Sequence, residues 1–334
     1  MANVLLTGGS GFIAAHVLDI LLEHGFNVVT TVRSQAKGDW ILKAHPGLSK
    51  EKLSYAVVED IAKEGAFDEV VKLAPFEYVI HTASPFHFKF TDPVKEILDP
   101  AIKGTTGILK AIKASAPTVK RVVITSSFAA IVNSAKHEKL YDESVWNPVT
   151  WDQAVNDKAS TYRGSKTFAE RAAWEFVEKE KPGFDLATIN PPFVFGPVIH
   201  YLNSLDSLNT SNERIHDLAT GKAKDGLPPT GTFLWVDVRD TALAHVRAIE
   251  VPEAGGSRFF TTAGYMSNKA IVDAIRETHP EYAANLPENG VDDTPADIYK
   301  IDNSKVKNVL GIKFRTLKES VDDTVSSFAT VGSK

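Results

Sequence analysis

A tyrosine and a lysine lie four residues apart in the segment Tyr162-Arg-Gly-Ser-Lys166. In a helix, residues i and i+4 share a face, so the phenol and the ammonium point the same way. A nearby cation stabilises phenolate and is expected to lower the pKa of Tyr162 from its ordinary value of about 10 toward neutrality. The pair is therefore predicted to act as a general acid, with Tyr162 protonating an alkoxide as hydride arrives.

The same spacing recurs in Tyr265-Met-Ser-Asn-Lys269, so spacing alone does not identify the pair. Ser267 is a good N-cap for a helix that begins near Asn268, which leaves Tyr265 outside the helix. Tyr162 instead follows Ser160 and Thr161, either of which can cap a helix, and precedes an apolar stripe. We predict catalysis for the first pair and lobe packing for the second.

Two hydroxyl groups end the apolar run Arg121–Ser127. In an open α/β sheet, ligands lie at the carboxyl ends of the strands, where Ser126 and Ser127 could polarise a substrate carbonyl. The alternative is that these serines only cap the following turn.

A glycine-rich turn near the amino terminus joins a short strand, Val4–Leu6, to an amphipathic helix. Gly8, Gly11 and Ala14 recur every three residues, as a turn, a close pyrophosphate and a tightly packed helix require. The free N–H groups of the helix start can receive a phosphate. A glycine-rich turn without any ligand is the alternative.

The residues after the second strand indicate which dinucleotide binds. Sheets that bind NAD place an acid there for the ribose 2′-hydroxyl, but no acid occurs between Glu23 and Asp39. Arg33 and Lys37 occupy the stretch, and a charge-assisted bond of roughly 1.5–3 kcal/mol to a 2′-phosphate favours NADPH about tenfold to a hundredfold. Asp60, after the third strand, is a candidate for the adenine amino group or for a local cap.

Strand patterns alternate with helix patterns through the first two-thirds of the chain, which carries these residues. This alternation predicts an α/β fold with a doubly wound parallel (Rossmann) sheet. The runs show little polar alternation, as expected for strands covered on both faces. The predicted strands are Asn3–Thr7, Asn27–Val32, Leu53–Val58, Tyr78–Thr82, Arg121–Ser126 and Asp185–Asn190. The predicted helices are Phe12–His24, Phe67–Leu73, Thr105–Ala114 and Thr161–Lys179, with capped starts at Asp92-Pro93 and Asp99-Pro100.

Beyond Asn190, proline pairs punctuate shorter elements. We expect a dinucleotide-binding core over residues 1–190, joined by part of 230–265, and a smaller substrate lobe over most of 191–334 that does not fold independently. Its predicted elements are the strands Phe233–Val236 and Arg258–Thr262 and the helices Val238–Ile249, Lys269–Glu277 and Leu317–Phe328.

Composition restricts the partners. The 334 residues are 43% hydrophobic, carry a net charge of −5 and include no cysteine. There is no basic stripe, no apolar run of about 20 residues and no signal sequence, so we expect no nucleic acid, no membrane and a cytoplasmic location. Disulfides and cysteine metal sites are excluded. His81 and His87 lack further ligands at metal-binding spacing, so no metal is expected.

Taken together, the chain resembles the extended short-chain dehydrogenases/reductases over nearly its whole length. Within them it is most similar to the fungal aldehyde/ketone reductases related to yeast NADPH-dependent methylglyoxal (isovaleraldehyde) reductase, next to dihydroflavonol and cinnamoyl-CoA reductases. The segments that carry the resemblance are Thr7–Ala14, Val32–Gln35, His81–Phe86, Val122–Ser127, Trp146–Trp151, Asn190–Pro197 and Val236–Asp240.

The resemblance implies that Ser127 binds the substrate carbonyl, Tyr162 gives the proton and Lys166 holds the nicotinamide ribose. It also implies NADPH contacts from Gly8, Gly11, Phe12, Ile13, Arg33, Lys37, Asp60, Ile61, Thr82, Ala83, Ser84, Pro191 and Phe193. One departure is the segment Pro100–Thr105, which lacks the asparagine that many members use in a proton relay. We expect water to serve there.

Aromatic residues in the loops after the strands indicate the substrate. An aromatic lining would favour a hydrophobic or aromatic carbonyl compound, although each ring could instead belong to the core. The predicted pocket residues are Phe86, Phe88, Phe128, Phe195 and Tyr201, with Phe193 beside the cofactor. Two alternatives remain open: a nucleotide-sugar epimerase or dehydratase, which would need a polar diphosphate site, and a non-catalytic dinucleotide sensor. The expected assembly is a monomer or a homodimer.

Overall fold

The computed structural model describes residues 2–84 and 90–331. Its centre is a seven-stranded sheet in which all paired strands are parallel, in the order β10-β7-β5-β4-β1-β2-β3. The predicted α/β fold with a doubly wound sheet is confirmed, and the six predicted strands of its core end within one residue of those observed. The bounds are β1 Asn3–Thr7, β2 Asn27–Val32, β3 Leu53–Val57, β4 Tyr78–His81, β5 Arg121–Thr125, β7 Asp185–Asn190 and β10 Ser257–Phe260.

The sheet reverses its winding direction at β1. Leu6 pairs with Thr30 of β2 on one side and with Ile80 of β4 on the other, and the chain fills the two halves in opposite directions. Loops leaving adjacent strands on opposite sides open a crevice at the carboxyl ends of the strands. The geometry therefore predicts a ligand site above β1 and β4.

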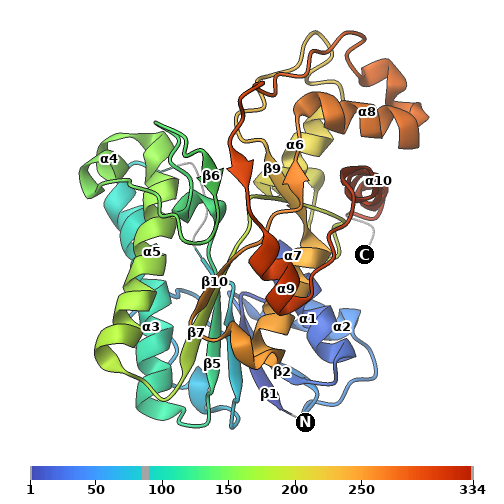
Figure 1. The fold of residues 1–334 in the computed structure, drawn as a ribbon. Coiled ribbons are helices and arrows are strands. Elements are labelled where there is room, and N and C mark those ends of the chain that lie inside the picture. Colours follow the sequence, from blue (N-terminus) through green and yellow to red (C-terminus); the bar gives the residue numbers. More distant parts are fainter. Residues whose placement is uncertain (1, 85–89, 332–334) are drawn as a thin grey trace.

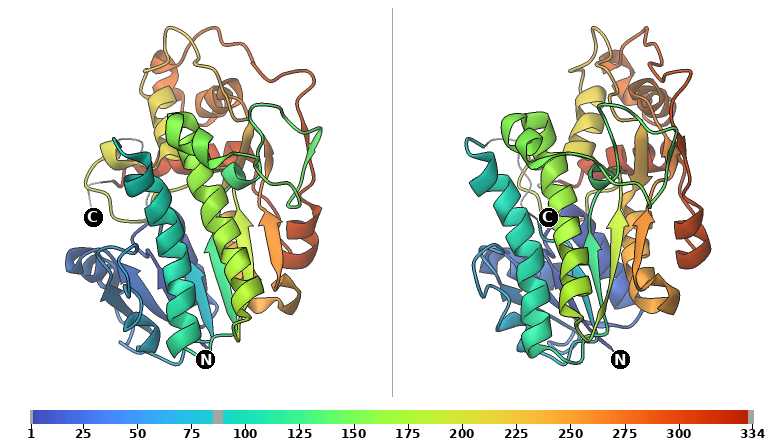
Figure 2. Two further views of the ribbon diagram at one scale, coloured as in Figure 1. Left: turned by 90° about the vertical axis from the view of Figure 1, so that its left-hand side faces the viewer. Right: turned by 60° about the vertical axis from the view of Figure 1, so that its left-hand side comes forward.

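Helices cover both faces of the sheet (Figures 1 and 2). On one side lie α3 (Asp99–Ser115) and α5 (Lys158–Glu180), and on the other lie α1 (Phe12–Glu23), α7 (Val238–Glu250) and α9 (Ser304–Leu310). Adjacent residues of β1 divide between the two cores: Leu5 packs with the α3 side, whereas Val4 and Leu6 pack with the α1 side. Burial of each such side chain contributes roughly 1.5–3 kcal/mol, which explains the unbroken apolar run.

A smaller lobe is built around a second sheet. In it, β9 (Leu234–Asp237) pairs in parallel with β8 (Phe193–Phe195) and antiparallel with β11 (Gly264–Tyr265). Its core is shared with α6 (Thr210–Ala219), α8 (Asn268–Thr278) and α10 (Leu317–Phe328). Between these elements the chain returns to the main sheet as α7 and β10, so the two parts are interleaved in sequence.

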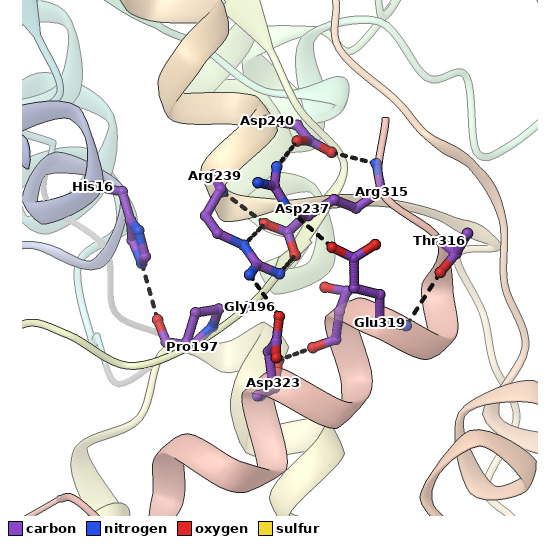
Figure 3. Close-up of polar contacts among 12 residues, drawn as sticks. His16, Gly196, Pro197, Asp237, Arg239, Asp240, Arg315, Thr316, Glu319 and Asp323 are labelled. Carbon is purple, nitrogen blue, oxygen red and sulfur yellow. Dashed lines mark hydrogen bonds and ion pairs between the residues drawn. The ribbon is translucent and has the colours of Figure 1, made fainter. Parts of the chain in front are cut away.

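Ion pairs at the start of α7 hold α10 in place (Figure 3). Arg239 binds Asp237 at 2.8 Å and Asp323 of α10 at 2.6 Å, while the backbone N–H of Arg315 donates to Asp240 at 2.8 Å. Burial acts to raise the pKa of Asp237, but the hydrogen bonds and charge of Arg239 outweigh it, so that pKa lies below its ordinary value. Charged residues of the segment Val236–Asp240 thus serve to assemble the small lobe by attaching α10 and the chain before it to α7.

Several elements differ from the predictions. Phe67–Leu73 forms only a 3-10 turn at Val70–Lys72, in which Lys72 N–H and Leu73 N–H donate to carbonyls three residues earlier, while Phe67, Val70 and Val71 are still buried in the core. Asp92 does cap the next helical segment through Val94 N–H, but a π turn, Val94–Leu98, runs directly into α3 without a restart at Asp99. Elements not predicted are α2 (Gln35–Ala44), α4 (Trp151–Asn156), β6 (Leu140–Tyr141) and β12 (Lys300–Ile301), besides β8, β11, α6 and α9. Within residues 2–84 and 90–331, no helix is long and apolar enough to cross a bilayer.

Candidate active site

A cavity of about 470 Å³ opens where the winding of the sheet reverses. It brings together the three predicted catalytic residues, Ser127, Tyr162 and Lys166. Its walls also hold the predicted cofactor residues Gly8, Gly11, Phe12, Ile13, Arg33, Lys37, Asp60, Ile61, Thr82, Ala83, Ser84 and Pro191. Residues far apart in the sequence therefore share one site.

The glycine turn forms the floor of the cavity. Gly8 has φ +75°, and a Cβ added to it would lie 3.1 Å from the Ala83 Cα atom. Gly11 N–H donates to the Gly8 carbonyl at 2.8 Å, and α1 begins at the next residue. A side chain at Gly8 would strain the backbone and press on Ala83. The turn ends at the N-terminus of α1, whose first N–H groups can bind an anion, so it fits a dinucleotide pyrophosphate.

The end of β4 is attached to the glycine turn by Thr7. Its hydroxyl accepts from Ala83 N–H at 3.2 Å and shares a hydrogen bond with His81 Nδ1 at 2.8 Å, while the Thr82 hydroxyl donates to the Thr7 carbonyl at 2.6 Å. Burial lowers the pKa of His81 to about 3, so the ring is neutral. No group of three potential ligands for a metal occurs among the residues described, and His87 lies outside them.

The predicted 2′-phosphate residues lie on the rim. Arg33 follows β2 directly, and Lys37 lies in the first turn of α2. Burial, together with the neighbouring charge of Arg33, lowers the pKa of Lys37. Two cations held close together favour a dianion between them. Asp60 also lines the cavity, but its carboxylate accepts from Ala62 N–H at 2.8 Å, as the alternative role in a local cap predicts.

The helix that carries Tyr162 and Lys166 starts earlier than predicted. Asp157, not Ser160 or Thr161, caps α5, and its carboxylate accepts from Ala159 N–H and Ser160 N–H. The cap places Tyr162 in the second turn of the helix, one turn before Lys166.

The second Tyr-x3-Lys match has the predicted packing role. Tyr265 lies in β11, outside α8, and its hydroxyl donates to the Tyr299 carbonyl at 2.7 Å. Ser267 caps α8 through Ala270 N–H.

The electrostatics of the pair differ from the prediction. Burial is the largest effect on the Tyr162 phenol and raises its pKa, while a hydrogen bond with Ser127 acts in the opposite direction. The expectation of a lowered pKa is therefore wrong, because desolvation of a phenolate outweighs the hydrogen bond with Ser127. Burial also lowers the pKa of Lys166 to about 8, against the opposing charge of Glu170. The phenol is thus neutral near pH 7, which is the form that donates a proton.

Ser127, rather than Ser126, shares a hydrogen bond with Tyr162. Ser127 Oγ also accepts from Ala129 N–H at 3.1 Å, so the serine caps the next turn as well. Ser126 Oγ donates instead to the Glu170 carboxylate at 2.5 Å. The two neighbouring hydroxyls therefore have different environments, one facing the phenol and one bound in the core.

The predicted aromatic pocket is not what the structure shows. Phe128 is buried against Phe260, with ring centroids 5.2 Å apart, and Phe195 is wholly buried in the small lobe. Phe193 packs under Arg214, outside the cavity lining, and Tyr201 packs on Trp40. Phe128 and Phe195 gain more from burial in a core than from lining a cavity, whereas Tyr201 lies on the surface. Phe86 and Phe88 lie outside the described residues.

Other side chains line the cavity on the small-lobe side. They are Pro192, Val194, Asn209, Thr210 and Ser211, of which the last three stand at the start of α6. The cluster Asn209-Thr-Ser211 is a helix-start signal in the sequence from which these residues could have been predicted. Glu170 was also missed, although a carboxylate within the apolar stripe of α5, four residues after Lys166, is a recognisable signal.

Comparisons with known proteins agree with this geometry. Residues 4–296 match the model of the NAD dependent epimerase/dehydratase family. The chain is 54% identical to the ketoreductase azaE of Aspergillus niger and 38% identical to the NADPH-dependent methylglyoxal reductase GRE2 of Saccharomyces cerevisiae, each over 97% of both chains. The structure of Gre2 from Candida albicans in complex with NADPH superposes with a TM-score of 0.93 at 38% identity, over the full length of both chains.

The predicted resemblance is confirmed by the match over most of the chain and by several relatives above 30% identity. A cinnamoyl-CoA reductase, CAD2 of Medicago truncatula, is more distant at 36% identity over 97% of this chain. This chain belongs to the NAD dependent epimerase/dehydratase family, the extended short-chain dehydrogenases/reductases.

Proposed function

We propose that this protein reduces aldehydes or ketones to alcohols with NADPH. The observation that carries the proposal is that Ser127, Tyr162 and Lys166 line the same cavity as the glycine turn. Relatives named as a ketoreductase and as NADPH-dependent methylglyoxal reductases support it.

Each of the three catalytic residues has a separate role in the proposed reaction. NADPH, when bound, supplies the hydride. The Ser127 and Tyr162 hydroxyls, which share a hydrogen bond, would both bind the carbonyl oxygen and stabilise the charge that develops on it. Tyr162 then gives its proton to that oxygen, and the Lys166 ammonium holds the nicotinamide ribose and stabilises the resulting phenolate.

Arg33 and Lys37 select NADPH in this proposal. They occupy the rim at the end of β2, where an acid would bind the ribose of NAD. Because Arg33 is exposed, the selectivity it gives is reduced by solvent screening.

The sequence prediction of a hydrophobic or aromatic carbonyl compound was based on aromatic rings, and Phe128, Phe195 and Tyr201 do not line the cavity. Other side chains therefore have to support the substrate class. Pro192 and Val194 provide apolar surface, whereas Asn209, Thr210 and Ser211 provide hydrogen-bonding groups. We propose a small carbonyl compound with an apolar body and one further polar group. A nucleotide-sugar substrate is less well supported, because its diphosphate would need cations on the small-lobe side and none is among these five residues.

The test is NADPH oxidation, followed at 340 nm, with a panel of aliphatic and aromatic aldehydes, ketones and dicarbonyl compounds. The wild-type chain should oxidise NADPH with some of them, and Tyr162→Phe should lose at least about a hundredfold in kcat while binding NADPH normally. Normal binding without any turnover by the wild type would favour the non-catalytic sensor. Near-normal turnover by Tyr162→Phe would contradict the assignment of the acid.

We also propose a cytoplasmic location and a monomeric or homodimeric state. The family's small-molecule chemistry requires neither nucleic acid nor membrane. Cell fractionation and size-exclusion chromatography with light scattering test both statements, and a membrane-bound fraction or a larger assembly would contradict them.

A further inference from the structure

A fully buried carboxylate lies on α5, the catalytic helix that carries Tyr162 and Lys166. Glu170 is 1% exposed and is placed one turn after Lys166 and two turns after Tyr162 on α5. A buried carboxylate is costly unless donors surround it. Donors come from four different elements, so the position of the carboxylate is fixed from several directions.

One carboxylate oxygen of Glu170 faces the strand ends that form the active site. It accepts from Ser126 Oγ at 2.5 Å and from Asn190 Nδ2 at 2.7 Å. Ser126 directly precedes Ser127, and Asn190 Nδ2 also donates to the Ser127 carbonyl at 3.3 Å. Both bonds thus act on the backbone that carries the serine of the active site.

The other carboxylate oxygen faces the core. It accepts from Arg258 Nε at 2.6 Å, from Thr188 Oγ1 at 3.1 Å and from Trp174 Nε1 at 3.3 Å. Arg258, on the edge strand β10, is itself fixed by the Glu143 and Val145 carbonyls and by the Trp146 ring, 3.7 Å from its guanidinium carbon. The ion pair therefore connects the edge of the sheet to the catalytic helix.

The charge of Glu170 also acts on Lys166. Within residues 2–84 and 90–331, Glu170 on its own helix and His81 at the end of β4 interact electrostatically with Lys166. His81 is neutral above pH 4, so it adds no charge there. Glu170 raises the pKa of Lys166 against the larger effect of burial, and without it the ammonium would lose its proton at a lower pH.

We infer that Glu170 is a positioning residue for carbonyl reduction: its carboxylate sets the place of Ser127 through its hydrogen bonds with Ser126 and Asn190 and places a negative charge one turn from Lys166. The inference rests on the proposed function. It assigns Glu170 no contact with substrate or cofactor, and its effect reaches the reaction through Ser127 and Lys166.

The test is Glu170→Gln, which keeps the shape and removes the charge. We expect kcat to fall about tenfold or more, KM and the NADPH Kd to change little, and the basic limb of the kcat profile to move to lower pH. A merely structural residue would not move that limb.

The matched control is Asp185→Asn. The Arg121–Asp185 pair joins the same two strands, β5 and β7, at their opposite ends, with a 2.6 Å contact. Removing this charge should lower the melting temperature and leave kcat and the pH profile unchanged. Wild-type kcat and pH profile in Glu170→Gln would overturn the inference, as would equal changes in both variants.

Ser126→Ala is a second variant for the case in which Glu170→Gln does not fold. It removes one hydrogen bond to Glu170 and leaves the charge in place. We expect kcat to fall about threefold or more with an unchanged basic limb, and unchanged kcat would overturn the inference. Wild-type turnover is measured first; its absence would refute the proposed function instead, and NADPH binding followed by fluorescence would show that the cofactor site is intact.

Discussion

Substitutions at the glycine turn, which forms the floor of the cavity, can test how tightly this turn is packed against β2. A Cβ added to Gly9 would lie 2.0 Å from Thr30 Oγ1 and 3.1 Å from Thr30 Cγ2. Thr30 is wholly buried, and its hydroxyl donates to the Leu6 carbonyl at 2.9 Å. The threonine therefore has no free space to move into, and Gly9→Ala must displace the turn or β2.

The expected cost follows from that overlap. Overpacking of a core costs about 1–3 kcal/mol, so Gly9→Ala should lower the free energy of unfolding by that amount. Thr30→Ala should cost about 1–2 kcal/mol through the lost hydrogen bond and cavity. In the double variant the new methyl group occupies the space of the removed atoms. The two costs should therefore fall short of additivity by about 1–2 kcal/mol.

Urea unfolding of the four proteins measures this coupling, and fluorescence titration measures NADPH binding. Gly9 N–H donates to the Thr31 carbonyl at 2.9 Å, so a displaced turn should also weaken NADPH binding in Gly9→Ala, and the double variant should restore part of it. Gly107→Ala is the control. An added Cβ there meets nothing within 4 Å, and within α3 alanine should be more stable than glycine by about 0.5–1 kcal/mol. Additive costs, or a Gly9→Ala variant within about 0.5 kcal/mol of wild type, would refute the reasoning.

Three further predictions concern charge. Because the pKa of Lys166 lies at about 8 and the reaction uses the ammonium, kcat/KM should fall as the pH rises through 8, and a profile flat to pH 9.5 would contradict this role. Arg33→Asp should raise the Kd of NADPH at least about tenfold and that of NADH less than about threefold in titrations, whereas equal losses would show that Arg33 does not bind the phosphate. The pKa values of His81, His200 and His245 are lowered by burial to about 3, 4 and 4. As the pH falls below about 6.5, these histidines bind protons in the unfolded chain before they do so in the folded protein. The free energy of unfolding should therefore decrease below pH 6.5, by up to about 1.4 kcal/mol per pH unit for each histidine. In urea titrations at pH 6.5 and 5.5, His245→Gln should reduce that slope; an unchanged slope would contradict the assignment.

The sequence predicts the long elements of the sheet better than the short ones between them. Strands that are buried on both faces, such as β1, have unbroken apolar runs because neither face contacts solvent, and such runs can be recognised in the sequence. The ten-residue helices α2 and α6 were missed because charged and polar residues weaken their apolar stripes. Their stability comes from packing on neighbouring elements, which local sequence does not show. The division into a core of 1–190 and a smaller lobe stays a prediction.

The sequence predicts those site residues whose positions follow from a general rule, that ligands bind at the carboxyl ends of the strands in an open α/β sheet. Gly8 follows β1 and Ser127 follows β5, the strands on either side of β4, so their meeting follows from the order of the parallel strands. The pocket prediction failed for Phe128 because a loop position does not determine exposure: Phe128 lies three residues after the end of β5 and yet is 3% exposed. For a side chain of that size, burial in the core is strongly favoured, and no local pattern distinguishes the two outcomes.

The catalytic helix shows why the pKa prediction failed and what compensates. Tyr162, Lys166, Glu170 and Trp174 recur every four residues along α5, and each step of four turns the side chain by about 40° around the axis. The stripe therefore runs from the cavity into the core, and burial acts on every group along it. Burial opposes charge on both Tyr162 and Lys166. The Glu170 carboxylate one turn deeper, paired with Arg258, acts in the opposite direction and raises the pKa of Lys166. The proton chemistry of the cavity then depends on an ion pair that never contacts the substrate.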